Sequence, residues 1–312
     1  MENLGSPNRM GDSNPTKLPR FTPRTIPRLL KIRPYIINFW GLGLRYLVNG
    51  RNRSGYDVKV RGARPQSLHC SDRAELAFVI YSAYFGVTLL PDSEVAPHVQ
   101  HLLGRFRYIR ERLESKFTTD QIRLYSTGGW PGFKEAALYA LIRRVRPLEV
   151  IETGVGQGIS STFILDALHE NGRGHLTSID LPNFDPSGYR YGDGTVDRVF
   201  VPTELGAGWL VPEVLRSRWT LLIGPSQDVL PTLSIRPQVF LHDSMHTYEH
   251  MKMEFEWAWS RLPMGGLLVS DDISWNKAFP DFLVAHAPEA VPLCVEEVGV
   301  AFRAVPPSEI SV

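Results

Sequence analysis

The stretch 148-LEVIETGVGQGISSTFILDALHE-170 decides the fold of this chain. An apolar run ends at Glu152 and passes through three closely spaced glycines into a helical pattern. Gly154, Gly156 and Gly158 let the backbone turn sharply and let a ligand approach closely. Their spacing differs from the G-x-G-x-x-G dinucleotide fingerprint, and no Gly-Lys-Ser/Thr phosphate loop follows. On its own, the loop is also consistent with a purely structural turn between a strand and a helix.

Strands alternate with helices in the rest of the chain. The predicted strands are 148–152, 175–180, 219–223, 238–241, 267–270, 292–297 and 299–304. The predicted helices are 73–85, 97–117, 133–145, 159–170, 248–262 and 280–286. This order predicts a Rossmann-like α/β fold with a seven-stranded, mostly parallel sheet, in which the closing hairpin makes one C-terminal strand antiparallel. Ligands of such sheets bind at the carboxyl ends of the strands.

Composition excludes several classes of protein. Of 312 residues, 43% are hydrophobic and 21% are charged, which rules out a chain that is disordered throughout. Two cysteines, Cys70 and Cys294, cannot build a disulfide framework and fit a reducing compartment. The net charge of +1 gives no overall attraction to nucleic acid, so we expect no nucleic-acid partner. The first 20 residues contain no apolar signal segment, and we expect a cytoplasmic protein.

The N-terminal part of the chain is basic. Residues 1–75 contain 14 Lys and Arg against 5 Asp and Glu. We expect a flexible basic tail at 1–30, a helical cap or interface region at 31–120, and the α/β domain at 121–312. An interface region would suit a homo-oligomer. The apolar segment 35–48 is too short to span a bilayer, and it is either a packing segment or a peripheral membrane contact beside basic residues that face anionic headgroups.

Polar residues at the ends of the second and third strands predict a nucleoside site. A carboxylate at Asp180 can accept both hydroxyls of a ribose. Glu152, directly before the glycines, would repel a pyrophosphate and attract a cationic ligand. After the third strand, the polar side chains of 224-GPSQD-228 can hydrogen-bond the edge of an adenine. Taken singly, each of these features is also typical of an ordinary cap or turn.

Acidic residues follow the fourth and fifth strands. Asp243, Asp271 and Asp272 would repel one another at this edge unless a cation joined them. Oxygen ligands of this kind suit Mg²⁺ or another divalent cation, although the acids could instead cap helices. His246 is suited to act as a general base, with a structural role as the alternative. A zinc site at His242, His246 and His250 is disfavoured, because His242 still belongs to the strand.

In this order, the motifs resemble the class I S-adenosylmethionine (SAM)-dependent methyltransferases over residues 121–304. The segment 240-FLHDSMHTYE-249 is similar to the D-x-x-H-x-Y pattern of the metal-dependent sugar O-methyltransferases, which are related to the catechol enzymes. The resemblance implies that Asp243, Asp271 and Asp272 are metal ligands and that His246 is the base. The residues that we assign to the cofactor are Glu152, Gly154, Gly156, Gly158, Asp180, Ser226, Gln227 and Asp228.

The resemblance implies Mg-assisted methyl transfer to a hydroxyl of a vicinal diol: a sugar in a glycan or natural product, or a phenolic compound. Two alternatives stay open, a metal-independent methyltransferase acting on a small molecule and a non-catalytic, cofactor-binding regulatory protein. The glycine spacing and the acids argue against an NAD-dependent oxidoreductase. The long segment 181–218 is a candidate lid, whose covering side chains would be Tyr189, Arg190, Tyr191 and Trp209.

Overall fold

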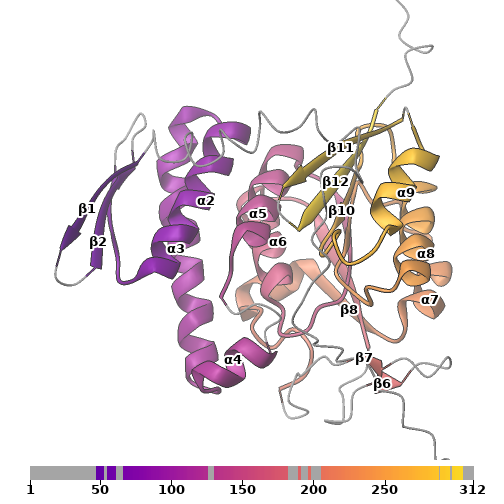
Figure 1. Ribbon diagram of the computed structural model, residues 1–312, viewed down its shortest axis with the longest axis horizontal. Coiled ribbons are helices and arrows are strands. Elements are labelled where there is room, and N and C mark those ends of the chain that lie inside the picture. Colours follow the sequence, from indigo (N-terminus) through magenta and orange to yellow (C-terminus); the bar gives the residue numbers. More distant parts are fainter. Residues whose placement is uncertain are drawn as a thin grey trace, which may run out of the picture.

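The structure is a computed structural model. It describes residues 47–52, 55–60, 66–125, 130–181, 189–190, 196–197, 205–287, 289–295 and 297–304. A central sheet carries helices on both faces, and a helical layer with a small second sheet lies outside one of these faces (Figure 1). The predictions for the tail at 1–30 and for most of the apolar segment 35–48 lie outside the described residues. No helix in the described ranges combines the length and apolar character needed to cross a membrane.

The central sheet confirms the predicted topology. Its strands are β4 (Glu149–Thr153), β5 (His175–Asp180), β8 (Trp219–Ile223), β9 (Val239–His242), β10 (Leu267–Ser270), β11 (Ala290–Val295) and β12 (Val298–Arg303). Their order is β11-β12-β10-β9-β4-β5-β8, and β12 alone is antiparallel to its neighbours. Chain order reverses between β4 and β9, which is where ligands of such sheets bind.

Helices cover both faces of this sheet. One face carries α5 (Phe133–Val145) and α6 (Ile159–Glu170); the other carries α7 (Ser226–Val229), α8 (Tyr248–Trp259) and α9 (Ala278–Ala285) (Figure 1). Short 3₁₀ helices span Glu213–Arg218 and Leu230–Thr232, and the two-residue strands β6 (Tyr189–Arg190) and β7 (Val196–Asp197) pair with each other. The predicted helices 133–145 and 159–170 are confirmed at both ends.

The N-terminal layer is partly different from what the sequence predicted. It holds α2 (Arg73–Leu89), α3 (Asp92–Glu114) and α4 (Thr119–Tyr125). Outside them lies an antiparallel sheet of β1 (Leu47–Asn52), β2 (Gly55–Val60) and β3 (Gln66–Cys70), within the region 31–120 that we expected to be a helical cap or interface. The helix expected to start at Pro97 begins five residues earlier. Asp92 and Glu94 in its first turn suit the helix dipole, and the helix accommodates the proline inside it.

The N-terminal helices share a core with the main sheet. The ring of Phe78 on α2 lies 5.0 Å from that of Phe106 on α3 and 5.7 Å from that of Phe163 on α6. All three rings are buried, and they belong to the same apolar cluster as Val150 in β4. Residues on one side of α2 and α3 are therefore packed into the α/β unit. On their other side, Val79 and Val99 belong to a second apolar cluster that includes Val58 of the outer sheet.

A buried ionic cluster joins α3 to α6. Asp166 on α6 accepts hydrogen bonds from His101 Nε2 at 2.7 Å and from Arg105 Nε and Nη2 at 3.0 and 2.9 Å. Burial opposes the charge on Asp166, but His101 and Arg105 outweigh burial and hold the pKa of this carboxyl below its usual value. The hydrogen bond to Asp166 in turn raises the pKa of His101.

Asp166→Ala is expected to destabilise the protein by about 3 kcal/mol, because it leaves a mostly buried Arg105 without its carboxylate. Denaturant unfolding would measure this, and Glu170→Ala on the same helix, where the carboxylate is 41% exposed, should cost far less.

The pH dependence of the stability that His101 contributes has a definite sign. The contribution of His101 is complete below the usual pKa of 6.5 and is lost as pH rises through its raised folded value. A His101→Gln variant that kept the same pH dependence would contradict this interpretation.

Candidate functional site

Strand register brings the glycine loop and two of the predicted acids side by side. Thr153 at the end of β4 pairs with His242 of β9, and His242 pairs with Ser270 of β10. The next residue of each strand is Gly154, Asp243 and Asp271, respectively. Gly154 has a φ of 83°, and a Cβ atom there would lie 1.9 Å from the carbonyl oxygen of Asp243. The glycine loop therefore lies directly against the backbone of Asp243 and Ser244.

The carboxylate of Glu152 lies behind the glycine loop. It is fully buried and accepts hydrogen bonds from the hydroxyls of Ser160 and Ser161 at 2.6 Å and of Ser178 at 2.7 Å. Burial raises the pKa of Glu152. Both carboxylate oxygens are thus occupied by hydroxyls of α6 and β5. In this geometry Glu152 fixes the loop against its helix, whereas we had expected it to face a cationic ligand.

Asp180 lies where a ribose-binding carboxylate was expected. At the end of β5, its Oδ2 accepts from the backbone N–H of Gly156 at 2.9 Å, and its Oδ1 accepts from that of Leu181 at 2.8 Å. Burial raises the pKa of Asp180 to about 6. The Asp180 carboxylate thus links the glycine loop to the residue that follows β5.

A segment of the predicted lid packs on the glycine loop. Gly208 N donates to the carbonyl of Gly156 at 2.9 Å, and the indole of Trp209 donates to Gln157. A Cβ atom at Gly158 would lie 2.7 Å from the Cα of Gly208. Trp209 is buried by this contact. Tyr191 and the side chains of Tyr189 and Arg190 lie outside the described residues.

Lys134 occupies the position where the sequence predicted a divalent cation. Its Nζ lies 2.8 Å from Asp243 Oδ2 and 2.5 Å from Asp271 Oδ2. Burial opposes the ammonium charge, but both acids outweigh burial and raise the pKa of Lys134 well above its usual value. Burial and the neighbouring Asp271 raise the pKa of Asp243, and Lys134 outweighs burial at Asp271 and lowers its pKa.

Sequence reasoning missed Lys134. It lies in the first turn of α5, whose N-cap is Gly132, and a cation there faces the positive end of the helix dipole. An unfavourable charge at a helix start indicates a partner elsewhere in the fold, and this was the available signal. The partners follow 109 and 137 residues later, so no local pattern identifies them.

Asp272, after β10, and His246, after β9, approach each other at the same edge of the sheet. Asp272 has a φ of 49°, and its Oδ2 lies 3.9 Å from His246 Nε2. Burial and the neighbouring Asp271 raise the pKa of Asp272 to about 6. Burial lowers the pKa of His246 to about 3, so its imidazole is neutral, and its buried Nε2 has no hydrogen-bond partner among the described residues.

Ser226 differs from its expected role, since its side chain is turned inward. It approaches His250 Nε2 at 3.0 Å and donates to Glu254, instead of facing an adenine. Gln227 and Asp228 are exposed at the start of α7, beside the end of β8. A cofactor contact at this corner would therefore come from these two residues or from backbone.

Glu254 is a second residue that the sequence analysis missed. Fully buried on α8, it accepts from Ser244 at 2.9 Å, from Thr153 at 2.6 Å, and pairs with His242 Nδ1 at 2.6 Å and His250 Nε2 at 2.9 Å. It links the ends of β4 and β9 to α8. His242 and His250 thus share one buried carboxylate.

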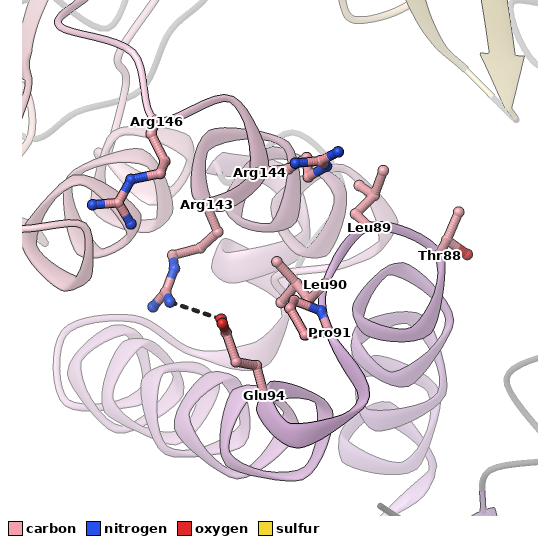
Figure 2. Close-up of a pocket in the computed structure, with 8 residues that line it drawn as sticks. All are labelled: Thr88, Leu89, Leu90, Pro91, Glu94, Arg143, Arg144 and Arg146. Atoms are coloured by element: carbon pink, nitrogen blue, oxygen red, sulfur yellow. Dashed lines mark hydrogen bonds and ion pairs between the residues drawn. The ribbon is translucent and has the colours of Figure 1, made fainter.

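A pocket of about 500 Å³ lies elsewhere, at the far end of α5 (Figure 2). Arg143 pairs with Glu94 across it at 3.1 Å, and two further arginines come from the same end of α5. Its lining residues are Thr88, Leu89, Leu90, Pro91, Glu94, Arg143, Arg144 and Arg146. Since α5 leads from here into the start of β4, this pocket is at the amino edge of the sheet, away from the glycine loop.

The predicted magnesium ligands do not fit a magnesium site as they are arranged. Mg²⁺ requires close octahedral oxygen coordination. The Lys134 ammonium lies between Asp243 and Asp271, and Asp272 lies toward His246. Within the described ranges, no group of three or more His, Cys, Asp or Glu is arranged to hold a metal ion.

The sheet order, with the glycine loop after the first strand of the domain, defines a Rossmann-like fold. Residues 151–273 match the family model of a methyltransferase domain. The chain therefore carries a methyltransferase domain over residues 151–273. A search of curated proteins found no sequence that matches this chain.

Several solved methyltransferase structures are similar to this chain. SAH-bound PaMTH1 of Podospora anserina is 13% identical and covers 72% of this chain and 94% of its own, with a TM-score of 0.44. The O-methyltransferase NovP is 15% identical, with coverages of 66% and 99% and a TM-score of 0.47. The O-methyltransferase TomG of Streptomyces achromogenes, in complex with SAM, is 17% identical, with coverages of 72% and 96% and a TM-score of 0.42.

Proposed function

We propose that this enzyme transfers the methyl group of SAM to a hydroxyl oxygen of a small acceptor with neighbouring hydroxyls, such as a sugar of a glycan or natural product, or a catechol. The observation that carries this proposal is the cluster of Lys134, Asp243 and Asp271 directly beside Gly154. A cluster of hydrogen-bonding groups at the end of the cofactor loop suits a polar acceptor that must be oriented toward the methyl group.

In the proposed reaction, the acceptor oxygen attacks the methyl carbon of SAM. A new O–C bond forms as the C–S bond breaks, the electron pair of that bond stays on sulfur, and S-adenosylhomocysteine is released. The hydroxyl proton leaves to a base of the protein. In this proposal Asp180, which anchors the glycine loop through Gly156, binds the ribose, and Gln227 and Asp228 at the start of α7 contact the adenine.

His246 is the proposed base. Its imidazole is neutral, and its Nε2 is buried without a partner among the described residues. Trp275, whose ring lies 5.3 Å from that of His246, limits the positions the imidazole can take. A neutral, oriented imidazole can accept the proton as the O–C bond forms.

Magnesium assistance, which the sequence resemblance implies, stays a prediction. For Mg²⁺ to bind Asp243 and Asp271, Lys134 would first have to leave the space between them. No step of the proposed reaction is therefore assigned to a metal.

Calorimetric titration with SAM, followed by a panel of catechol and sugar acceptors, tests the proposed function. We expect SAM to bind and at least one acceptor to gain a methyl group by mass spectrometry. Absence of SAM binding would overturn the proposal. Binding without transfer to any acceptor would favour the cofactor-binding regulatory protein.

His246→Ala is expected to lower kcat on the responsive acceptor by about 100-fold or more, because general-base catalysis contributes 10²–10⁴-fold. The Kd for SAM should stay unchanged, since His246 is not among the residues assigned to the cofactor. His69→Ala, on the outer sheet with a side chain that is 44% exposed, is the matched control. Equal kcat values in the two variants would remove His246 from the mechanism.

Peripheral membrane contact through the basic N-terminal part and formation of a homo-oligomer also stay predictions. Comparing vesicle binding of the full chain with that of a variant lacking residues 1–48, on vesicles with and without anionic lipid, tests the first. Light scattering tests the second.

A further inference from the structure

We propose that Lys134 is the built-in cation of this site: its ammonium holds Asp243 and Asp271 together in place of a divalent metal and donates a hydrogen bond to the acceptor oxygen. The inference rests on the proposed methyl transfer. It makes this protein a metal-independent enzyme with the acidic pattern of a metal-dependent one.

The geometry around the ammonium supports this role. An ammonium has three N–H donors, and Lys134 uses two of them, at 2.8 Å to Asp243 and at 2.5 Å to Asp271. No further acceptor for the third is found among the described residues. All three side chains are largely but not fully buried, with 16–21% exposure, so a ligand can still reach the cluster.

The two carboxylates need a cation whatever its identity. They follow adjacent parallel strands in register, β9 and β10, so the sheet itself forces them together. Two unpaired carboxylates at this separation would repel each other strongly. Lys134 supplies the compensating charge from the first turn of α5, which begins at this edge of the sheet.

The position of Lys134 is difficult to explain as support for its own helix. A cation in the first turn is disfavoured by the helix dipole, and Glu135, the next residue, already satisfies the N–H of Gly132 at 2.7 Å. The lysine is therefore paired with the strand-end acids and not with the helix start. The third acid, Asp272, approaches His246 instead, which leaves a two-carboxylate, one-ammonium site.

Binding of Mn²⁺, followed by electron paramagnetic resonance on the full chain, tests the inference without any acceptor. We expect the wild-type protein to show no Mn²⁺ site that depends on Asp243. Lys134→Met should free both carboxylates and bind Mn²⁺ at least about tenfold more tightly than wild type. Adding Asp243→Asn to Lys134→Met should remove that gain, which shows that the new site uses the freed carboxylate.

Two controls protect this test. Arg144→Met removes a positive charge from the other end of the same helix and should leave Mn²⁺ binding at the wild-type level. Should Lys134→Met fail to fold by circular dichroism, the comparison of wild type with Asp243→Asn still decides. Wild-type Mn²⁺ binding that Asp243→Asn abolishes would overturn the inference, because a metal would then displace the lysine.

The acceptor reaction separates this inference from the proposed function. With a responsive acceptor, wild-type activity should survive exhaustive treatment with a chelator, and Lys134→Met should lose at least about tenfold in kcat. Activity that disappears on chelation and returns with Mg²⁺ would overturn the metal-independent role while leaving the methyltransferase intact. Failure to bind SAM would instead contradict the proposed function itself.

Discussion

Alanine at position 154 is expected to abolish SAM binding. The added Cβ would lie 1.9 Å from the carbonyl oxygen of Asp243, 2.5 Å from its carbonyl carbon and 2.9 Å from Ser244 N. All three are backbone atoms, so no side chain can move aside to make room. Either β9 shifts away from β4 or the loop leaves its position, and each change displaces the groups around the cofactor. Calorimetry should show at least about a 100-fold loss of affinity for SAM, which corresponds to about 2.8 kcal/mol.

The matched control for this prediction is Gly172→Ala. Gly172 has a φ of 68°, similar to the 83° of Gly154, but a Cβ atom there meets nothing within 4 Å. This variant therefore carries the cost of a left-handed alanine alone, about 1 kcal/mol, and should bind SAM like wild type. If Gly154→Ala also binds SAM like wild type, the close contact of Gly154 with the backbone of Asp243 is not needed for the cofactor site.

The adjacency behind this prediction was available from the sequence. The strands that end before Gly154, Asp243 and Asp271 were recognised from short apolar runs, and parallel strands share one carboxyl edge. Alternating strands and helices were enough to predict the seven-stranded sheet, because each element follows its own local period. The short connection between the last two strands likewise predicted that one of them is antiparallel, and the structure shows that this strand is β12.

Side-chain pairing at that edge could not be read in the same way. Glu152 was interpreted as facing a ligand, yet hydroxyls from α6 and β5 surround it. Lys134 and Glu254 lie on helices, where no local pattern shows which strand end each will meet. A carboxylate or an ammonium in a sequence reveals its charge but not every partner: Lys134 pairs with Asp243, 109 residues later, and Glu254 accepts from Thr153, 101 residues earlier.

Loss of the Glu254 carboxylate is expected to produce the largest loss of stability among the changes considered. Glu254 is fully buried and pairs with His242 and His250, while hydroxyls of Thr153 and Ser244 donate to it. Glu254→Ala would leave these groups buried without their shared acceptor. We expect the free energy of unfolding to fall by about 4 kcal/mol, a large part of the 5–15 kcal/mol of a typical domain.

The same carboxylate should make the protein sensitive to acid. Burial opposes its charge, but His242 and His250 outweigh burial and hold the pKa of Glu254 well below the usual 4.5. A carboxylate with a lowered folded pKa contributes its full stability above the usual value and loses it as pH falls through the folded value. Wild type should therefore lose stability steeply below about pH 4.5, and Glu254→Gln should flatten that part of the profile.

The prediction is tested by comparing the thermal unfolding of Glu254→Ala with that of Glu256→Ala. Both residues are on α8, but the carboxylate of Glu256 is 45% exposed and pairs with His286 near the surface. Glu256→Ala should unfold close to wild type. Ser244 follows Asp243 directly, and Thr153 precedes Gly154, so Glu254→Ala should also weaken SAM binding at temperatures where it remains folded. A variant that unfolds like wild type and binds SAM normally would show that the network fills space without holding the ends of β4 and β9 in register.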